Sequence, residues 1–231
     1  MSRRDDIDVD FFFFDDTPEG EDPDSASPTL RLYHRLLWSK PLPDGRPFIL
    51  SQPAAKAPYL VYEADGLRIS FGSDTIATRH ARALHHFFSQ IAEEENEAFL
   101  RRSYTICGFT IFPRHPNSIN QLRGRHPRIQ DRWDLTLEAI RRHYEGGRSP
   151  LSDVLARNAA FFALFGSFRG YVEHFLFQDF LDSSGRVRML LPFDDFTKPP
   201  LPTDLATYRA YRAANLELFE ARRNRILASL H

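Results

Sequence analysis

The chain has 231 residues, of which 42% are hydrophobic and 26% charged, a balance that excludes a wholly disordered protein. The 30 basic residues are matched by 31 acidic ones, so no overall electrostatic field directs the chain to nucleic acid or to a membrane. Cys107 is the only cysteine, which excludes an internal disulfide and a cysteine-based zinc finger. No run approaches the roughly 18–20 apolar residues that cross a bilayer, so we expect no membrane partner and a cytoplasmic protein.

The N-terminal segment, residues 1–24, differs in composition from the rest. It holds ten acidic residues against two arginines, and Phe11–Phe14 lie in its middle. Four exposed phenylalanines are costly, so a freely solvated tail is disfavoured. We therefore treat 1–24 as a segment of its own, before a single domain over 25–231. The segment is predicted to be an edge strand with acidic flanks, or alternatively a docking peptide for a protein partner.

The first predicted elements are a helix and a hairpin. Ser27-Pro28 has the residues preferred at a helix start, and Pro41 ends the helical pattern. Two strands, 59–63 and 67–71, flank Asp65-Gly66, which is a strong hairpin signal.

A second helix and a strand follow the hairpin. Ser73-Asp74 is predicted to cap a helix that runs to about Gln90. Residues 104–112 are β-branched and aromatic with almost no charge, which is typical of a central strand. Residues 113–128, rich in Pro, Asn and Arg, are predicted to form a loop.

The second half of the chain is predicted to be mainly helical. The spacing of apolar residues predicts one helix from Asp131 and another from Ser149-Pro150. A short strand is expected over 186–191. Further helices are predicted over 168–181 and from Thr203 or Asp204 to about Ser229. We therefore predict an α+β fold, in which a small, mostly antiparallel sheet packs against an α-helical C-terminal half.

An arginine-rich segment, 101–148, carries the strongest functional signal. It contains ten arginines against four acids, although the whole chain is nearly neutral. Its densest part leads into a predicted helix start, where unpaired N–H groups favour anions. The planar guanidinium group suits phosphate. We predict a binding site for a phosphate-bearing ligand, a nucleotide or nucleic acid, with ligand-binding residues Asn120, Arg123, Arg125, Arg128 and Arg132. Asp131 and Asp134 are the candidate catalytic acid or base if the protein is an enzyme.

A milder interpretation of the same segment stays open. Asp131 could cap the helix, Asp134 could sit favourably in its first turn, and the arginines could pair with these carboxylates or with the acidic segment. The protein would then be a non-enzymatic protein–protein interaction module. The sequence contains no Walker A, dinucleotide-binding or nucleophile-elbow motif, and its scattered histidines predict no metal site.

Much of the chain resembles a family of bacterial proteins known as a domain of unknown function. The resemblance implies a single domain, and it transfers no activity, cofactor or catalytic residue. The matching strings are TLRLYHRLLWSKPLPDG (29–45), YTICGFTIFP (104–113), INQLRG (119–124), RIQDRWDLTLEAIRRHY (128–144), SPLSDVL (149–155), ALFGSFRGYVEHFLFQDF (163–180) and LPFDDF (191–196).

Overall fold

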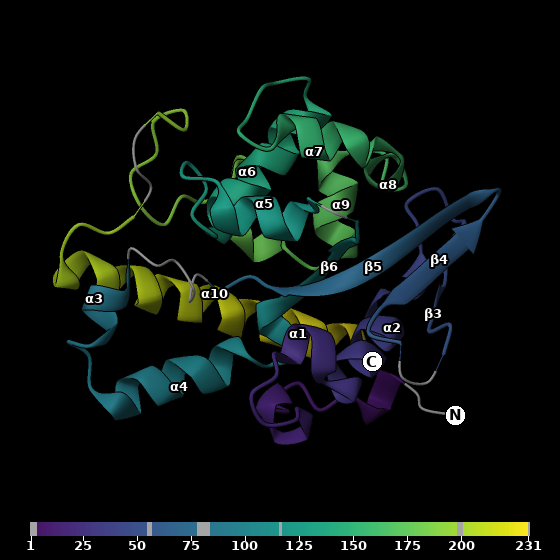
Figure 1. Cartoon of the computed structure of the whole chain (residues 1–231). Coiled ribbons are helices and arrows are strands. Elements are labelled where there is room, and N and C mark those ends of the chain that lie inside the picture. The colour runs from purple at the N-terminus through teal and green to yellow at the C-terminus, as the bar shows by residue number, and fades with distance from the viewer. Residues whose placement is uncertain (1–3, 55–56, 78–83, 116, 198–200, 231) are drawn as a thin grey trace.

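A computed structural model describes residues 4–54, 57–77, 84–115, 117–197 and 201–230. Strands gather in the first half of the chain and helices in the second, so the predicted α+β class is confirmed. Figure 1 shows the layers: the sheet lies between a group of helices from the second half and a layer made by the N-terminal helices and the last helix.

The sheet has four antiparallel strands in the order β3-β4-β5-β6. Their bounds are β3 Leu50–Ser51, β4 Leu60–Ala64, β5 Leu67–Thr75 and β6 Phe109–Pro113. The hairpin predicted at Asp65-Gly66 is confirmed, since β4 pairs with β5 and both turn residues have positive φ, 52° and 76°. A smaller antiparallel pair joins β1 Lys40–Pro41 to β2 Pro47–Phe48.

The predicted helix start at Ser27 is also confirmed. The Ser27 side chain accepts a hydrogen bond from the Leu30 N–H at the start of α2 Pro28–Trp38. A one-turn helix, α1 Pro23–Ala26, precedes it, and the Asp22 side chain caps that turn. Among the described residues, the other α-helices of the first half are α3 His85–Phe88 and α4 Glu93–Ser103.

The helix start predicted at Ser73-Asp74 is wrong. These residues continue β5, where Ser73 pairs with Ile111 and Asp74 with Thr110 of β6. The cross-strand ladder satisfies the backbone groups that a helix would have satisfied, so pairing with a distant strand overrides the local capping signal. The part of that predicted helix over 78–83 lies outside the described residues.

The strand predicted over 104–112 exists in part, but it is not central. Residues Ile106–Gly108 form a 3₁₀ turn, and β6 lies at one edge of the sheet. Every residue of β6 is nevertheless buried. β6 lacks charged residues because its residues are covered by the rest of the fold, and not because it has a neighbouring strand on each side.

The second half contains six α-helices within the described residues. Their bounds are α5 Ile119–Arg125, α6 Trp133–Tyr144, α7 Ser152–Arg157, α8 Ala159–Ala163, α9 Phe168–His174 and α10 Leu205–Leu230. The predicted loop over 113–128 therefore contains a helix, α5, which the Ser118 side chain caps through the Gln121 N–H. Instead of a strand over 186–191, the described residues show one bridge, Leu181 to Val187.

The N-terminal segment is neither an edge strand nor a free peptide. It forms short 3₁₀ turns, and Phe13 is completely buried against Phe109 and Tyr33. Ile7 and Val9 belong to the same buried cluster. The phenylalanines are therefore engaged within the fold, and a protein partner that contacts the exposed acidic side chains of this segment stays a prediction.

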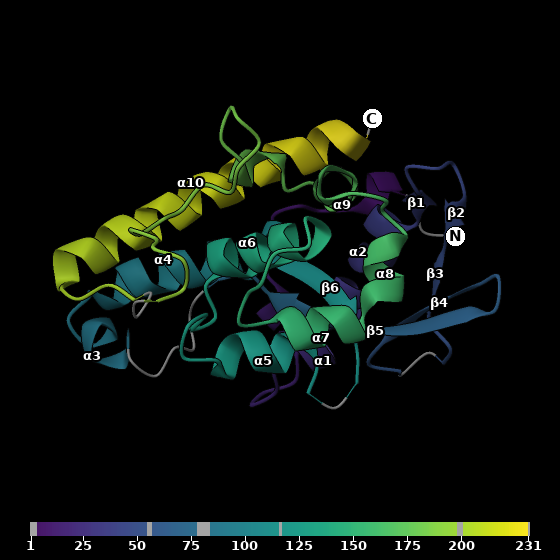
Figure 2. The ribbon, with the colours of Figure 1, turned by 90° about the horizontal axis from the view of Figure 1, so that it is seen from above.

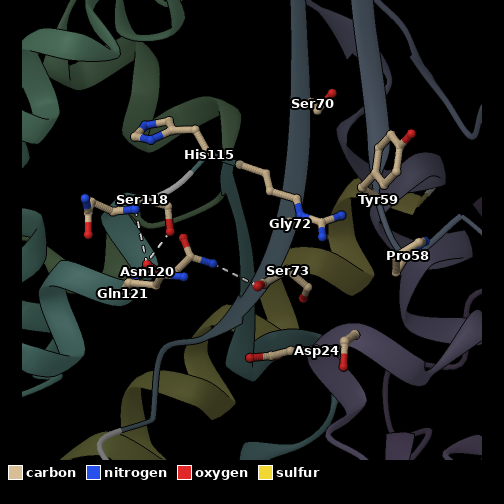
Figure 3. Close-up of a pocket in the computed structure, with 13 residues that line it drawn as sticks. Asp24, Pro58, Tyr59, Ser70, Gly72, Ser73, His115, Ser118, Asn120 and Gln121 are labelled. Carbon is tan, nitrogen blue, oxygen red and sulfur yellow. Dashed lines mark hydrogen bonds between the residues drawn. The ribbon is translucent and has the colours of Figure 1, made fainter.

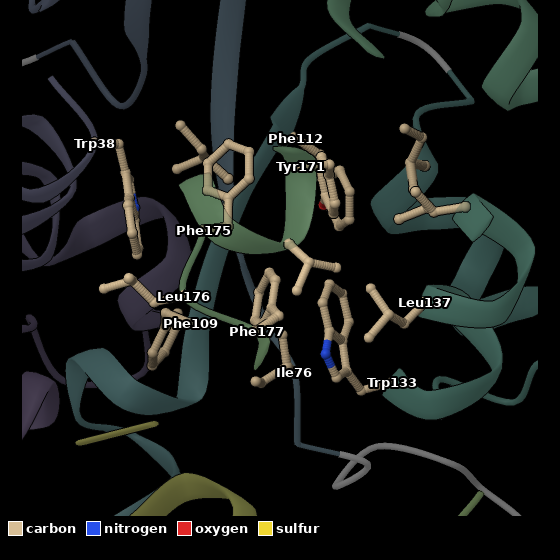
Figure 4. Packing of buried hydrophobic residues seen from close by; sticks show 14 of the residues in the cluster. Trp38, Ile76, Phe109, Phe112, Trp133, Leu137, Tyr171, Phe175, Leu176 and Phe177 are labelled. Atoms are coloured by element: carbon tan, nitrogen blue, oxygen red, sulfur yellow. The ribbon is translucent and has the colours of Figure 1, made fainter. Parts of the chain in front are cut away.

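One aromatic core joins the layers. Trp38 packs edge-on against Phe175 at 5.3 Å between ring centroids, and Trp133 packs against Phe177 at 4.7 Å. Figure 4 shows these rings meeting with Phe109 from β6 in one continuous cluster. Seen from above, the long helix α10 runs along one side of the molecule (Figure 2).

Candidate functional site

Arg123, the centre of the predicted arginine site, points inward. Its side chain has no exposed surface and pairs with Asp74 at 2.9 Å and with Asp131 Oδ1 at 2.7 Å. It also donates to the Thr75 carbonyl, the Asp131 carbonyl and the Thr136 hydroxyl. These acceptors use every nitrogen of the guanidinium, so Arg123 acts as an internal crosslink between β5, α5 and the start of α6.

The same crosslink holds an unusual backbone turn before α6. Gln130 and Asp131 have φ values of 51° and 62°, in the left-handed region that residues with a Cβ seldom adopt. The Asp131 N–H donates to the Arg123 carbonyl at 2.9 Å, which fixes the turn. Asp131 therefore does not cap α6; the residue at the cap position is Arg132, whose side chain makes no capping bond.

Arg132 and Asp134 form a second internal pair. Neither side chain is appreciably exposed, and Arg132 Nε donates to Asp134 Oδ1 at 3.0 Å. Asp134 also accepts from the Leu135 and Leu190 N–H groups. Arg132 and Asp134 therefore satisfy each other at the start of α6. In this conformation neither side chain is accessible to a ligand in solution.

Arg125 and Arg128 are exposed to solvent. Asn120 is partly buried and belongs to neither this exposed pair nor the buried pair of arginines. The structure therefore separates the predicted ligand-binding residues into a buried pair, an exposed pair and Asn120. A role for Arg125 and Arg128 in phosphate binding stays a prediction. Of the seven predicted site residues, Asn120 lines a large hollow that the described residues form.

This hollow, which we call the Asp24 cleft, has a volume of about 820 Å³. Figure 3 shows its construction: α1 supplies Asp24 at the base, β5 supplies Ser73, and the α5 side supplies Asn120. Tyr59 forms the opposite wall, ahead of β4. Four segments distant in sequence meet here because β5 runs between α1 and α5.

Two buried oxygen atoms of the Asp24 cleft have no hydrogen-bond donor. Asp24 Oδ1 and Asn120 Oδ1 are both buried and make no hydrogen bond within the described residues, although the Thr75 N–H lies near enough to the Asp24 carboxyl group to lower its pKa. Asn120 is held in place by its amide, which donates to the Ser73 carbonyl at 2.9 Å. A buried acceptor without a donor costs roughly 1–3 kcal/mol, so two in one cleft indicate a place where something else donates.

The rim of the Asp24 cleft carries positive charge. Arg114 lines it, is exposed, and places its guanidinium carbon 5.3 Å from the centre of the Tyr59 ring. Within the described residues, Arg114 has no ion pair with a carboxylate. His115 lies beside it, and its Nε2 is hydrogen-bonded with the Asn158 amide at 3.1 Å. The rim can therefore accept an anion.

The carboxyl groups behind the cleft are biased toward their neutral forms. Burial raises the pKa of Asp24 well above its ordinary value, and the nearby charges of Asp74, Asp22 and Asp131 raise it further. Burial also raises the pKa of Asp131, to about 7, although Arg123 opposes the shift. The raised pKa of Asp24 reduces the repulsion that its carboxyl group exerts on an anionic ligand.

We expect the stability that Asp131 contributes to fall as pH rises from 5 to 8. Its pKa is about 7 in the folded chain against an ordinary 3.8, so in this range the folded chain holds a proton that the unfolded chain has released. Denaturation of the wild type and Asp131→Asn at several pH values measures the effect. The wild type loses about 2–3 kcal/mol relative to the variant across this range.

Two buried histidines also make the stability depend on pH, and taking the difference between the wild type and the variant cancels their contribution. Burial lowers the pKa of both His34 and His174 to about 3, which gives stability a slope of the opposite sign between about pH 3 and 6.5. Both chains share that slope. A wild-type-minus-variant difference that does not change with pH would contradict the assignment of a raised pKa to Asp131.

Sequence reasoning missed most of the cleft. Asp24 belongs to the segment that the sequence predicts as an edge strand or a docking peptide, and Ser73 lies where the sequence predicts a helix start. The signal that could have located Asp24 is the Asp22-Pro23 pair, which favours a helix start and hence an ordered turn. No comparable local signal brings that turn next to Asn120.

Neither a metal centre nor a membrane span emerges from the described residues. They contain no group of three or more His, Cys, Asp or Glu side chains arranged to hold a metal ion. Within the same part of the chain, no helix combines the length and apolar character that a bilayer crossing requires.

The fold and cleft thus define an α+β protein with a hollow that β5, an inner strand of the four-stranded sheet, lines together with α1 and α5. Residues 7–226 match a family of unknown function, DUF6994, and the chain belongs to that family. The predicted resemblance to a domain of unknown function is therefore confirmed. No curated protein and no solved structure matches the chain.

Proposed function

We propose that the Asp24 cleft binds a small phosphate-bearing ligand with free hydroxyl groups, such as a nucleotide. The observation that carries this proposal is the pair of buried, unpartnered oxygens, Asp24 Oδ1 and Asn120 Oδ1, in one cleft. Hydroxyl groups donate hydrogen bonds, so a ribose could satisfy both oxygens at once.

The phosphate end of the ligand is assigned to the rim. Arg114 is the exposed cation there, and its guanidinium can donate two parallel hydrogen bonds to a phosphate. The Tyr59 ring holds this guanidinium from one side, which reduces the side-chain freedom lost on binding. This proposal keeps the ligand class that the sequence predicts and moves the site from the start of α6 to the cleft lined by Asn120.

Calorimetric titration with adenosine 5′-monophosphate tests the proposal. We expect saturable one-to-one binding by the wild type, and affinity reduced about tenfold in Asp24→Ala and in Asn120→Ala, because each variant loses one acceptor. Adenosine, which lacks the phosphate, should bind more weakly than the monophosphate.

Asn224→Ala is the matched control, since Asn224 is an exposed asparagine on α10 that does not line the cleft. Its affinity should equal that of the wild type. Melting curves establish that each variant is folded. Absence of binding by the wild type, or equal affinity in the cleft variants and the control, would contradict the proposal.

A further inference from the structure

A second, smaller hollow adjoins the Asp24 cleft. It has a volume of about 240 Å³, and its walls come from β5, the end of β6, the end of α7, and α8. We call it the arginine hollow. It shares Ser70, Arg114 and His115 with the Asp24 cleft, so one ligand could extend from the first hollow into the second.

The arginine hollow is strongly basic. Arg68, Arg114 and Arg157 line it, and no acid is among the described residues that do so. Arg68 pairs with Glu63, its neighbour across the β4–β5 hairpin, and Arg157 donates to the Asn117 carbonyl at 3.5 Å. Neither Arg114 nor Arg157 has an ion pair with a carboxylate in the described structure. Three guanidinium groups with one carboxylate partner leave an excess of two positive charges.

We infer that the ligand of the Asp24 cleft carries a second phosphate group that lies in the arginine hollow, as in a nucleoside 5′-diphosphate. The inference rests on the proposed function. The ribose would lie over Asp24 and Asn120, the first phosphate at Arg114, and the second between Arg68 and Arg157. Arg114 belongs to both hollows, which suits a group that bridges two phosphates.

A small diphosphate fits this arrangement better than a nucleic acid. Affinity for a nucleic acid comes mainly from several successive phosphates on an extended basic surface, whereas this chain has a formal net charge of −1. The positive charge is instead gathered around a hollow of about 240 Å³ that Ala160 and Phe161 of α8 also line. A hollow of this size has room for one additional phosphate group but not for a strand of nucleic acid.

The test compares adenosine 5′-diphosphate with adenosine 5′-monophosphate by calorimetry, in the absence of divalent cations. We expect the wild type to bind the diphosphate about tenfold more tightly, because the second phosphate gains charge-assisted hydrogen bonds. Arg157→Ala and Arg68→Ala should each reduce this preference while leaving the affinity for the monophosphate unchanged. Both arginines are exposed, so their replacement should not impair folding.

Arg169→Ala is the matched control, because Arg169 is an exposed arginine of α9 outside both hollows. It should retain the full preference. Equal affinity for the two nucleotides in the wild type overturns this inference and leaves the proposed function standing. If the wild type binds neither nucleotide, the proposed function is overturned as well. Tighter binding of a twelve-nucleotide oligothymidylate than of the diphosphate also overturns the inference, and it identifies nucleic acid as the partner.

Discussion

Arg123→Ala should lower the free energy of unfolding by about 3–5 kcal/mol at pH 8, above the pKa of about 7 of Asp131, since it leaves the carboxyl groups of Asp74 and Asp131 without their cation. Asp74 and Asp131 both pair with this guanidinium, and all three side chains are largely buried. The variant also frees the Thr75 and Asp131 carbonyls. It therefore removes both the charge balance and the hydrogen bonds that hold the left-handed turn before α6.

Arg125→Ala is the control, because Arg125 lies on the same helix and is exposed. We expect its free energy of unfolding to lie within about 0.5 kcal/mol of the wild type. Urea denaturation of both variants at one pH measures the difference. If Arg123→Ala proves as stable as Arg125→Ala, Arg123 is not a structural crosslink, and the interpretation of its segment as an external phosphate site regains support.

Arg222→Ala should also destabilise the fold by about 3–5 kcal/mol, for a different reason. Arg222 is completely buried and pairs with no carboxylate in the described structure. It donates to the carbonyls of Cys107 and Phe109 at 2.8 Å and of Phe175 at 3.1 Å, and it lies 4.2 Å from the Phe177 ring centre. Burial lowers the pKa of Arg222 to about 9. Its loss removes this donor from three carbonyls and leaves a cavity between α10 and the sheet.

The neighbouring residue provides the comparison for Arg222. Arg223 is partly exposed and pairs with Asp10, so Arg223→Ala should cost at most about 1 kcal/mol. Denaturation midpoints of the two variants should therefore differ clearly. A similar stability of the two variants would show that the three carbonyls find other donors and that Arg222 does not join α10 to the sheet.

The parts of the fold that sequence predicted correctly are those set by neighbouring residues. Ser27-Pro28 caps a helix and Asp65-Gly66 turns a hairpin because both signals act within a few residues. Ser73-Asp74 shows the limit of such signals. The same kind of capping pair became part of a strand because β6, more than thirty residues further along, provides the partner.

The candidate site was less predictable because it is assembled from distant segments. Asn120 was identified from its place in the arginine-rich segment, and it lines the cleft. Asp24, which comes from the N-terminal segment, meets it only in the folded chain. The predicted role of Arg123 assumed that a cluster of arginines faces outward, whereas Asp74 and Asp131 draw this one inward. Sequence shows the charges but not which carboxylates neutralise them.

A backbone-amide NMR titration with adenosine 5′-monophosphate tests the location of the proposed site most directly. We expect the signals that shift to belong to Ser25, Gly72, Ser73 and Gln121, which line the Asp24 cleft. Signals of Arg125 and Arg128, on the exposed side of the arginine-rich segment, should stay in place. Shifts at Arg125 and Arg128 with unmoved cleft signals would contradict the account.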